Sequence, residues 1–319
     1  MTPSWRSGTP IIGTSPGTTE WATKPVTAFP AWKMAARPHT LPAAVVPVLV
    51  GSGLAYGEGV FRWDAFLWAL VAALAIQIAA NFANDASDAA RGVDTEDRLG
   101  PPRMVALGVI SPKRMWLATW LAIGIGGVAA VFLTVIAGWV VLVIGAASVV
   151  AMLGYVGGPL PYGYRGMGEV FVFLFFGLAA TVGSRFVHDG LATMEAWLLA
   201  IPVGLLVTAI LVVNNLRDID TDASTGKRTL AVIMGRQRTR ILFMALVYTA
   251  LGLVAIFGTA GWVPRSTLFA GFLLPYATVP VRIVFSRDDG PSLIRALKAT
   301  ARLHLWFGVV VAAAAAFAP

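Results

Sequence analysis

The chain contains no cysteine among its 319 residues, and this absence excludes several kinds of chemistry. Without a thiol there is no disulfide, no thiolate nucleophile, no thioether-linked haem and no cysteine-ligated metal centre. Charge is also scarce, because only 13% of the residues are Asp, Glu, Lys or Arg, whereas a soluble domain carries about a quarter. Hydrophobic residues make up 57% of the chain and the mean hydropathy is +0.76. This composition predicts an integral membrane protein embedded in the lipid bilayer.

Apolar stretches follow one another with short connections, which predicts an all-α, polytopic membrane protein with one membrane domain over residues 31–319. Residues 1–30 are rich in Ser, Thr, Pro and Gly and lack an apolar core of signal-peptide length, so they are expected to form a mobile tail. A helix needs about 20 residues to cross a bilayer. Nine stretches reach or approach that length, over residues 40–56, 64–86, 115–134, 136–154, 168–187, 196–216, 241–259, 262–281 and 301–318.

Basic residues sort to one side of the nine predicted helices. If the N-terminus is cytoplasmic, all 24 Lys and Arg residues except Arg62, Arg185 and Arg265 fall on the cytoplasmic side. The positive-inside rule requires such a bias. We therefore expect a protein of the cytoplasmic membrane with its N-terminus inside and its C-terminus on the opposite side. The same bias accounts for the net charge of +8 without a nucleic acid partner.

Two acid-rich helix ends are predicted on the cytoplasmic side, at the ends of the second and sixth helices. The polar residues are Asn81, Asn84, Asp85 and Asp88 in the second helix, and Asn215, Asp218 and Asp222 in the sixth. Spacings of three, four and seven residues place each set on or beside one helix face. Asp220 points elsewhere if the sixth helix continues.

Carboxylates at the C-terminal end of a helix lie at the negative pole of its dipole, where they are unfavourable unless a cation is present. Ligands that are all oxygen, with no His or Cys among them, suit Mg²⁺. Arg and Lys residues follow each acidic cluster and are typical phosphate ligands. Either cluster alone is compatible with a solvated helix end, but two clusters of matching spacing at one membrane depth favour a diphosphate site.

With these two motifs, the sequence resembles a known family, the UbiA superfamily of membrane-embedded aromatic prenyltransferases. Its members are nine-helix proteins with Asp-rich motifs on helices two and six. The second motif fits as Asp218-x-x-x-Asp222. The first motif fits as Asn81-x-x-x-Asp85-x-x-Asp88 and departs from the commoner NxxxDxxxD spacing.

The unusual spacing of the first motif points to one branch of the superfamily, the 1,4-dihydroxy-2-naphthoate polyprenyltransferases of menaquinone biosynthesis. Three blocks resemble that branch: "NDASDAARGVDTEDRLGPPR", "YVGGPLPYGYRGMGEVFVFLFFG" and "NNLRDIDTDASTGKRTLAVIMGR". The 4-hydroxybenzoate and haem O branches usually carry "RT…RPL" after the first motif, where this chain has "RLGPPRMVALG". The three blocks together are specific, although any one alone would be weak.

The resemblance implies a helical bundle with a cytoplasmic-side active site and Mg²⁺ as cofactor. It also implies transfer of a polyprenyl group from polyprenyl diphosphate to 1,4-dihydroxy-2-naphthoate, with loss of CO₂, giving demethylmenaquinol. The expected metal ligands are Asp85, Asp88, Asp218 and Asp222, which also carry catalysis, together with Asn81. The expected diphosphate-binding residues are Asn81, Asn84, Arg91, Arg103, Asn215, Lys227 and Arg228.

The loop between the fourth and fifth predicted helices borders the same face. The ring of Tyr155 could stabilise an allylic cation, and Tyr164, Arg165 and Glu169 are candidate acceptor-binding residues. Alternatively, the tyrosines belong to an interfacial belt and Arg165 is a topological charge. Two other functions stay open: prenyl transfer to another ring such as 4-hydroxybenzoate or homogentisate, and cation transport through the intramembrane acids. The sequence gives neither the isoprenoid length nor the oligomeric state.

Overall fold

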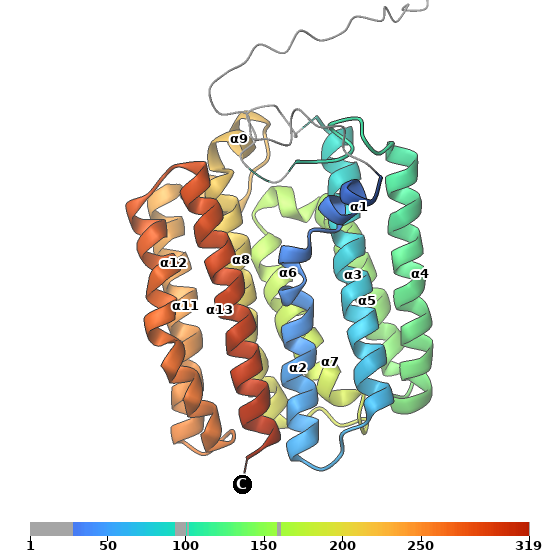
Figure 1. Cartoon of the computed structure of the whole chain (residues 1–319), viewed down its shortest axis with the longest axis vertical. Coiled ribbons are helices and arrows are strands. Elements are labelled where there is room, and N and C mark those ends of the chain that lie inside the picture. Colours follow the sequence, from blue (N-terminus) through green and yellow to red (C-terminus); the bar gives the residue numbers. More distant parts are fainter. Residues whose placement is uncertain (1–27, 93–99, 101, 158–160, 319) are drawn as a thin grey trace, which may run out of the picture.

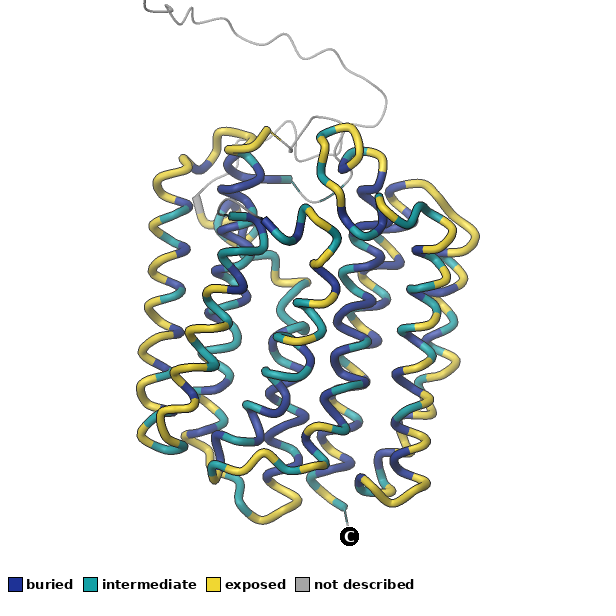
Figure 2. Tube along the Cα trace, turned by 180° about the vertical axis from the view of Figure 1, so that it is seen from behind, coloured by how far each residue is buried: buried dark blue, intermediate teal, exposed yellow. Residues whose placement is uncertain are grey.

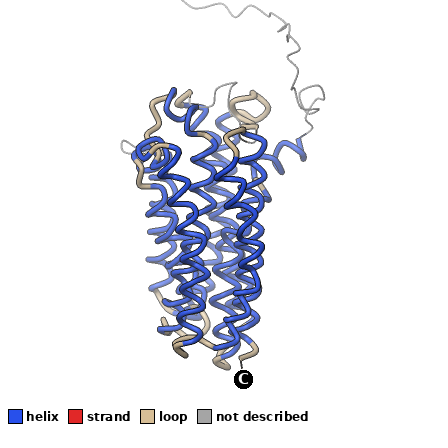
Figure 3. The backbone as a smooth tube through the Cα atoms, turned by 90° about the vertical axis from the view of Figure 1, so that its left-hand side faces the viewer, coloured by secondary structure: helices blue, strands red, loops and turns tan. Residues whose placement is uncertain are grey.

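The computed structural model describes residues 28–92, 100, 102–157 and 161–318, and this part of the chain is mostly helical and contains no β-strand. Long helices stand side by side in an upright bundle (Figure 1), and the view from its side shows only helices and their connecting loops (Figure 3). The predicted all-α fold is confirmed. Most of the predicted N-terminal tail, residues 1–27, lies outside the described residues.

The helices follow the predicted apolar stretches. The fifth stretch is one continuous helical segment in which a π-helix, η4, joins two short α-helices. The long elements are α2 (Pro42–Gly57), α3 (Trp63–Ala90), α4 (Pro112–Ala137), α5 (Val140–Val156), α6 (Gly168–Val172) with η4 (Phe173–Ala179) and α7 (Ala180–Phe186), α8 (Met194–Arg217), α11 (Arg236–Thr259), η5 (Arg265–Leu273) with α12 (Leu274–Ser286), and α13 (Gly290–Ala316). The short helices α1 (Ala28–Ala36), α9 (Ile219–Ser224) and α10 (Leu230–Met234) lie near one end of the bundle (Figure 1).

In the described part of the chain, seven helices are long and apolar enough to cross a membrane, judged by length and composition. They become eight if Phe29–Thr40 and Pro42–Gly57, which meet at a bend of 50°, form one broken span. The 17-residue helix α5 is a further, shorter apolar helix. These results confirm a multi-pass membrane architecture, whereas nine crossings stay a prediction.

The first apolar segment is bent at Arg37, because this residue adopts a left-handed conformation with φ of 50°. Pro38 follows it, and a residue before proline is disfavoured in the helical region. Helix α1 therefore ends before Arg37, and α2 starts afresh with Pro42 in its first turn. The hydroxyl of Thr40 donates to the carbonyl oxygen of Arg37 at 2.9 Å, which stabilises the bend.

The last helix starts well before the predicted residue 301. Asp289 caps α13, since its side chain accepts a hydrogen bond from the backbone N–H of Ser292 at 2.8 Å. The first turns of α13 carry charged residues, so a search for apolar runs does not include them. As a result, Arg295 and Lys298 lie on a helix instead of in the expected loop.

Helix α8 lies in the interior of the bundle, whereas α4 lies at its edge. Two-thirds of the apolar window of α8 (67%) is buried, against 22% for α4. Exposed positions gather on the outer helices (Figure 2), and along the apolar part of α4 they include Val128 and Val131. Such a surface suits contact with lipid.

Small residues bring α2 and α13 close together. A Cβ atom added to Gly53 would lie 2.5 Å from the carbonyl oxygen of Ala312, and one added to Gly308 would lie 2.4 Å from a methyl group of Val46. Close backbone approach of this kind is typical of helix packing in membranes. It fixes α2 against the C-terminal half of the bundle.

A buried polar network stabilises the end of the bundle that carries the C-terminus. The Arg185 guanidinium is 2% exposed and pairs with both Glu58 and Asp189, with 2.7 Å between Nη1 and the Asp189 carboxylate. Next to it, His188 Nδ1 accepts the backbone N–H of Arg62 at 3.0 Å, so the proton lies on Nε2, 3.1 Å from the Ser52 hydroxyl. These contacts join α2, the start of α3 and the end of α7.

Candidate active site

Both acid-rich helix ends lie at the same end of the bundle, opposite the C-terminus of the chain (Figure 1). The first set belongs to the last turns of α3. The second set does not lie on one continuous helix, because α8 ends at Arg217 and α9 begins at Ile219. Asp218 occupies the junction, and Asp222 lies on α9. The prediction for Asp220 assumed a continuous helix, which the structure does not have. Asp220 is exposed and pairs with Arg236 at 2.8 Å, so it lies outside the cluster of buried acids.

The acids of α3 organise the segment that follows the helix. The Asp85 carboxylate is 1% exposed and accepts the backbone N–H groups of Met104 and Val105 at 3.1 and 3.0 Å. This anchoring brings Arg103 back over the helix end, where its Nη2 lies 2.5 Å from Oδ2 of Asp88. Asp85 therefore positions the loop that supplies Arg103.

The two asparagines of the first set have different environments. The side-chain amide of Asn81 donates to the carbonyl oxygen of Ala36 and to the hydroxyl of Thr40, both at 2.9 Å. It thus connects α3 to the bend before α2. Both asparagines line the central cavity, and Asn84 is the less buried of the two.

In the second set, the two aspartates pair with basic side chains, and the asparagine bonds to a residue of α6. Arg217 grips Asp218 with two hydrogen bonds of 2.7 and 2.6 Å from Nε and Nη2. The Asn215 amide donates to the carboxylate of Glu169 at 2.9 Å, and both residues are buried. Asp222 lies 3.3 Å from Nζ of Lys227.

The turn after α9 returns Lys227 to Asp222. Gly226 has φ of +77°, which favours glycine, and Lys227 then donates its backbone N–H to the carbonyl oxygen of Asp222 at 2.9 Å. Burial raises the pKa of the Asp222 carboxyl. Its second oxygen, Oδ2, is buried and has no hydrogen-bond partner within the described residues.

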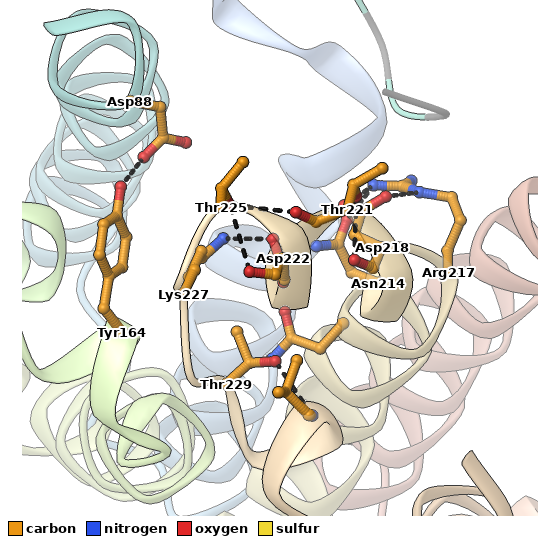
Figure 4. A network of polar contacts seen from close by, with 12 residues as sticks. Asp88, Tyr164, Asn214, Arg217, Asp218, Thr221, Asp222, Thr225, Lys227 and Thr229 are labelled. Atoms are coloured by element: carbon orange, nitrogen blue, oxygen red, sulfur yellow. Dashed lines mark hydrogen bonds and ion pairs between the residues drawn. The ribbon is translucent and has the colours of Figure 1, made fainter. Parts of the chain in front are cut away.

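Tyr164 connects the two halves of the site (Figure 4). It lies in the 3-10 turn η3 (Tyr162–Arg165), and its hydroxyl donates to Oδ1 of Asp88. The Lys227 ammonium and the Arg91 guanidinium lie 5.3 and 5.4 Å from the centre of its ring. Burial and the Asp88 carboxylate raise the pKa of the Tyr164 phenol, so the hydroxyl keeps its proton and acts as the donor.

A cavity of about 340 Å³ adjoins these helix ends and is lined mostly by apolar side chains of α2 to α8. Asn81, Asn84 and Asn214 line it at the level of the acid clusters, and Tyr155 lies beside them at the end of α5. At the other end it reaches Ala69, near the start of α3. From Ala69 to Asn84 the helix rises about 22 Å, so the cavity follows much of the bundle.

Aromatic rings form one wall of this cavity. Tyr162 stacks on Phe171 with ring centroids 3.8 Å apart, and Phe175 continues the stack one helical turn further. The Tyr162 hydroxyl donates to the carbonyl oxygen of Ala151, and its ring meets Tyr155 edge-on at 5.5 Å. Tyr155 is therefore held in place beside the mouth of the cavity.

Not every predicted residue lies within the cluster of buried acids and bases. The side chains of Arg91, Arg165 and Arg228 are exposed, although Arg91 reaches the Tyr164 ring. Arg217 is the reverse case. It was predicted only as one of the basic residues on the cytoplasmic side, yet it is 3% exposed and donates hydrogen bonds to Asp218. Its position directly before Asp218, at the end of an apolar helix, was the available signal.

Within the described residues, no group of three or more His, Cys, Asp or Glu side chains converges as a ready-made metal site. The donor chemistry fits Mg²⁺, since Asp85, Asp88, Asp218 and Asp222 offer only oxygen and all lie at one end of the bundle. The buried Oδ2 atom of Asp222 supplies an oxygen that no protein group binds in the described chain. Proteins commonly hold Mg²⁺ with one or two carboxylates, while water and phosphate complete the shell.

Comparisons with known proteins give matches over most of the chain. The profile of the UbiA prenyltransferase family matches residues 44–308. A 1,4-dihydroxy-2-naphthoate octaprenyltransferase of Mycobacterium tuberculosis is 38% identical over 291 residues, covering 91% of this chain and 98% of that protein. The Escherichia coli protein of the same name is 36% identical, covering 87% and 93%. A solved structure of a UbiA homologue from Archaeoglobus fulgidus, bound to GPP and Mg²⁺, superposes with a TM-score of 0.63 at 16% identity, covering 88% and 99%.

Proposed function

The chain belongs to the UbiA prenyltransferase family, as its motifs predicted, and we propose that it transfers a polyprenyl group from polyprenyl diphosphate to 1,4-dihydroxy-2-naphthoate in a Mg²⁺-dependent reaction that releases CO₂. The product would be demethylmenaquinol. The names of the relatives support this acceptor and this donor class, and the bound GPP and Mg²⁺ of the archaeal homologue support the cofactor.

One observation carries the proposal: a long apolar cavity meets paired acids and bases at one end of the bundle. An isoprenoid tail is apolar and a diphosphate is anionic, so a site for both needs this combination. The tail would lie along the cavity, and the diphosphate would lie at the helix ends. The polar level of the cavity, at Asn84 and Asn214, is where the reacting carbon would be held.

The polar residues divide into metal ligands and phosphate ligands. Asp85, Asp88, Asp218 and Asp222, with Asn81, would hold Mg²⁺, which when bound neutralises the charge that develops on the departing diphosphate. Arg103 and Lys227 lie against Asp88 and Asp222, and they would bind the phosphate oxygens. The remaining proposed diphosphate ligands are Asn84, Arg91, Asn215 and Arg228.

The apolar lining serves the other half of the reaction. As the bond between the allylic carbon and the diphosphate oxygen breaks, the allylic cation must meet the acceptor ring before it meets water. Tyr155 borders the cavity at this level, and its ring face would stabilise the cation. A carbon–carbon bond then forms at the ring carbon that carries the carboxylate. CO₂ leaves from the same carbon, and the electrons of its bond return to the ring.

The acceptor would enter from the solvent-facing end of the bundle. Arg165 is exposed on η3 and carries the charge that a naphthoate carboxylate requires. Glu169 is buried next to Asn215, where it would accept a hydrogen bond from a hydroxyl of the acceptor. We expect this end to face the cytoplasm, because the positive-inside rule assigns the basic residues of this end to that side.

The test is a reaction of the purified full-length protein with dihydroxynaphthoate, a polyprenyl diphosphate and Mg²⁺, with the products analysed by mass and released CO₂ measured. We expect a decarboxylated, prenylated product that disappears when Mg²⁺ is chelated. Asp222→Asn should abolish turnover. Asp220→Asn, on the same short helix but exposed and paired with Arg236, is the matched control and should retain it.

A panel of acceptors separates this proposal from its closest alternative. If 4-hydroxybenzoate or homogentisate is prenylated and the naphthoate is not, the assigned acceptor is wrong. If the naphthoate product keeps its carboxylate, the proposed decarboxylation is wrong.

A further inference from the structure

Tyr164 contacts both acid-rich elements at once, through three chemically different interactions. Its hydroxyl donates to Asp88 on α3. Its ring lies next to Lys227, which pairs with Asp222 on α9, and next to Arg91. Its carbonyl oxygen accepts the backbone N–H of Arg228 at 3.1 Å. Asp88 and Asp222 are 134 positions apart in the sequence, and the Tyr164 side chain contacts Asp88 directly and is linked to Asp222 through Lys227.

We propose that Tyr164 is a positioning residue that orients Asp88 through its hydroxyl and seats Lys227 and Arg91 against its ring, and that it does not bind the aromatic acceptor. This inference rests on the proposed function and deepens it, because it concerns the metal and diphosphate side of the same site. It replaces the acceptor-binding role that the sequence suggested for Tyr164.

The location of the ring argues against a contact with the acceptor. Tyr155 and Tyr162 line the cavity, whereas Tyr164 is absent from its lining in the part of the chain that the structure describes. Two cations lie within 5.4 Å of the Tyr164 ring centre, and they already use the attraction that its π-system offers to positive charge. An allylic cation placed there would also be repelled by Arg91 and Lys227.

The hydrogen bonds to Asp88 argue for a role in positioning a ligand. A carboxylate that binds a metal is commonly fixed by hydrogen bonds from residues behind it. Asp88 receives such bonds on both oxygens, from Tyr164 on Oδ1 and from Arg103 on Oδ2. Removal of a supporting partner of this kind lowers metal affinity or activity by about 10- to 100-fold.

The experiment compares Tyr164→Phe with Tyr162→Phe in the detergent-solubilised full-length protein. Both residues lie on η3 and both donate a phenolic hydrogen bond, but the bond of Tyr162 goes to the backbone of Ala151. Mn²⁺ serves as the probe, added together with inorganic diphosphate, and its binding is followed by electron paramagnetic resonance. We expect Tyr164→Phe to raise the half-saturating Mn²⁺ concentration by about 10- to 100-fold. Tyr162→Phe should leave it unchanged.

Steady-state kinetics provide the second readout. Tyr164→Phe should leave the KM for the acceptor unchanged, because the phenol does not contact it. Tyr164→Leu also removes the ring that seats Lys227 and Arg91, so it should further raise the KM for the prenyl diphosphate. A rise in the acceptor KM with unchanged Mn²⁺ binding would overturn the proposal, and so would Mn²⁺ binding that is equal in Tyr164→Phe and the wild type.

The wild-type protein distinguishes this proposal from the proposed function. If the wild type binds Mn²⁺ and prenylates the naphthoate but Tyr164→Phe behaves identically, only the role of Tyr164 is wrong. If the wild type itself transfers no prenyl group with any donor and acceptor, the proposed function is wrong and this inference falls with it.

Discussion

At the scale of single residues, three of the four carboxylates of the site are paired with a base: Asp88 with Arg103, Asp218 with Arg217, and Asp222 with Lys227. A buried carboxylate without a partner is costly, so a chain with so few charges must supply the bases nearby. Such bases are also the natural ligands of a diphosphate. Pairing therefore explains both how the acids are tolerated and why Arg and Lys accompany them.

The structure adds Arg217 to this set of bases, because the sequence did not single it out. Nε and Nη2 of its guanidinium group donate to the two carboxylate oxygens of Asp218, and Nη2 also donates to the side-chain oxygen of Asn214 at 3.0 Å. Lysine cannot reproduce this planar geometry. We expect Arg217→Lys to lower kcat/KM for the prenyl diphosphate by at least about 10-fold, because hydrogen bonds to a charged partner contribute about 1.5 to 3 kcal/mol.

The matched control for Arg217→Lys is Arg236→Lys. Arg236 also pairs with an aspartate, Asp220, but that aspartate is 87% exposed. Exposed pairs contribute little, so this variant should keep the wild-type kcat/KM. Equal losses in the two variants would show that the geometry at Asp218 is not what matters.

His188 predicts a pH dependence of stability. Burial and the neighbouring Arg185 charge lower its pKa to about 4, whereas an unfolded chain has a histidine pKa of about 6.5. Between these values the unfolded state binds more protons than the folded state. The free energy of unfolding should therefore decrease as the pH falls from about 6.5 towards 4, by up to about 1.4 kcal/mol per pH unit, and stay level above 6.5.

This dependence can be measured as the thermal unfolding midpoint in detergent at a series of pH values. His188→Gln removes the titrating group, so its midpoint should fall less steeply than that of the wild type. Parallel curves for the two proteins would exclude His188 as the cause.

Spacing predicted which acids lie together at this end of the bundle, but it did not predict their partners. Asp85, Asp88 and Asp222 follow from their positions at the ends of apolar stretches. The bond between Tyr164 and Asp88 spans 76 positions, and it depends on how the turn η3 folds back over the bundle. No local periodicity encodes such a contact. The hydrogen bonds that Asp85 accepts from backbone N–H groups could not be predicted either, because every residue except proline carries such a group.

At the scale of helices, the apolar runs were predictable and their ends were not. The junction at Asp218 interrupts a polar segment in which the residue pattern alone allows a continuous helix. The early start of α13 depends on the Asp289 cap, and the helix then carries Arg295 and Lys298 before its apolar run begins. The π-helix η4 occupies an apolar run that also suits an ordinary α-helix. It lies where Gly177 and Gly204 bring η4 and α8 into close contact, which is a property of the packed pair.

We predict that the isoprenoid tail lies along helix α3, so that the residues of this helix limit the length of tail that the cavity accepts. Small residues line the cavity along this helix, among them Ala69, Ala73 and Ala80, and each turn rises about 5.4 Å. A phenyl group at Ala73 would block the cavity below that depth. We expect Ala73→Phe to retain transfer from a short donor such as geranyl diphosphate and to lose transfer from long polyprenyl diphosphates.

Val71→Phe is the control for added bulk, because Val71 lies on the same helix at an exposed position. It should transfer long and short donors in the wild-type ratio. The measurement is the ratio of kcat/KM for the two donors in each variant. If Ala73→Phe lowers both values equally, the tail does not lie along α3.

At the scale of the whole molecule, the acid-rich end and the C-terminus lie at opposite ends of the bundle (Figure 1). The basic residues that the sequence assigns to the cytoplasmic side include Arg103, Arg217 and Lys227, and these lie at the acid-rich end. Arg185 lies in the network at the other end. The positive-inside rule then predicts that the proposed active site faces the cytoplasm.

The absence of cysteine makes this orientation directly testable, because any introduced thiol is the only one in the chain. Ser224 is exposed on α9 at the acid-rich end, and Ala192 is exposed in the connection between α7 and α8 at the other end. In intact cells, a membrane-impermeant maleimide should label Ala192→Cys and leave Ser224→Cys unlabelled until the membrane is opened. The reverse pattern would place the acids outside and would contradict the predicted orientation. Labelling at both positions before permeabilisation would mean that the two ends do not lie on opposite sides of a sealed bilayer.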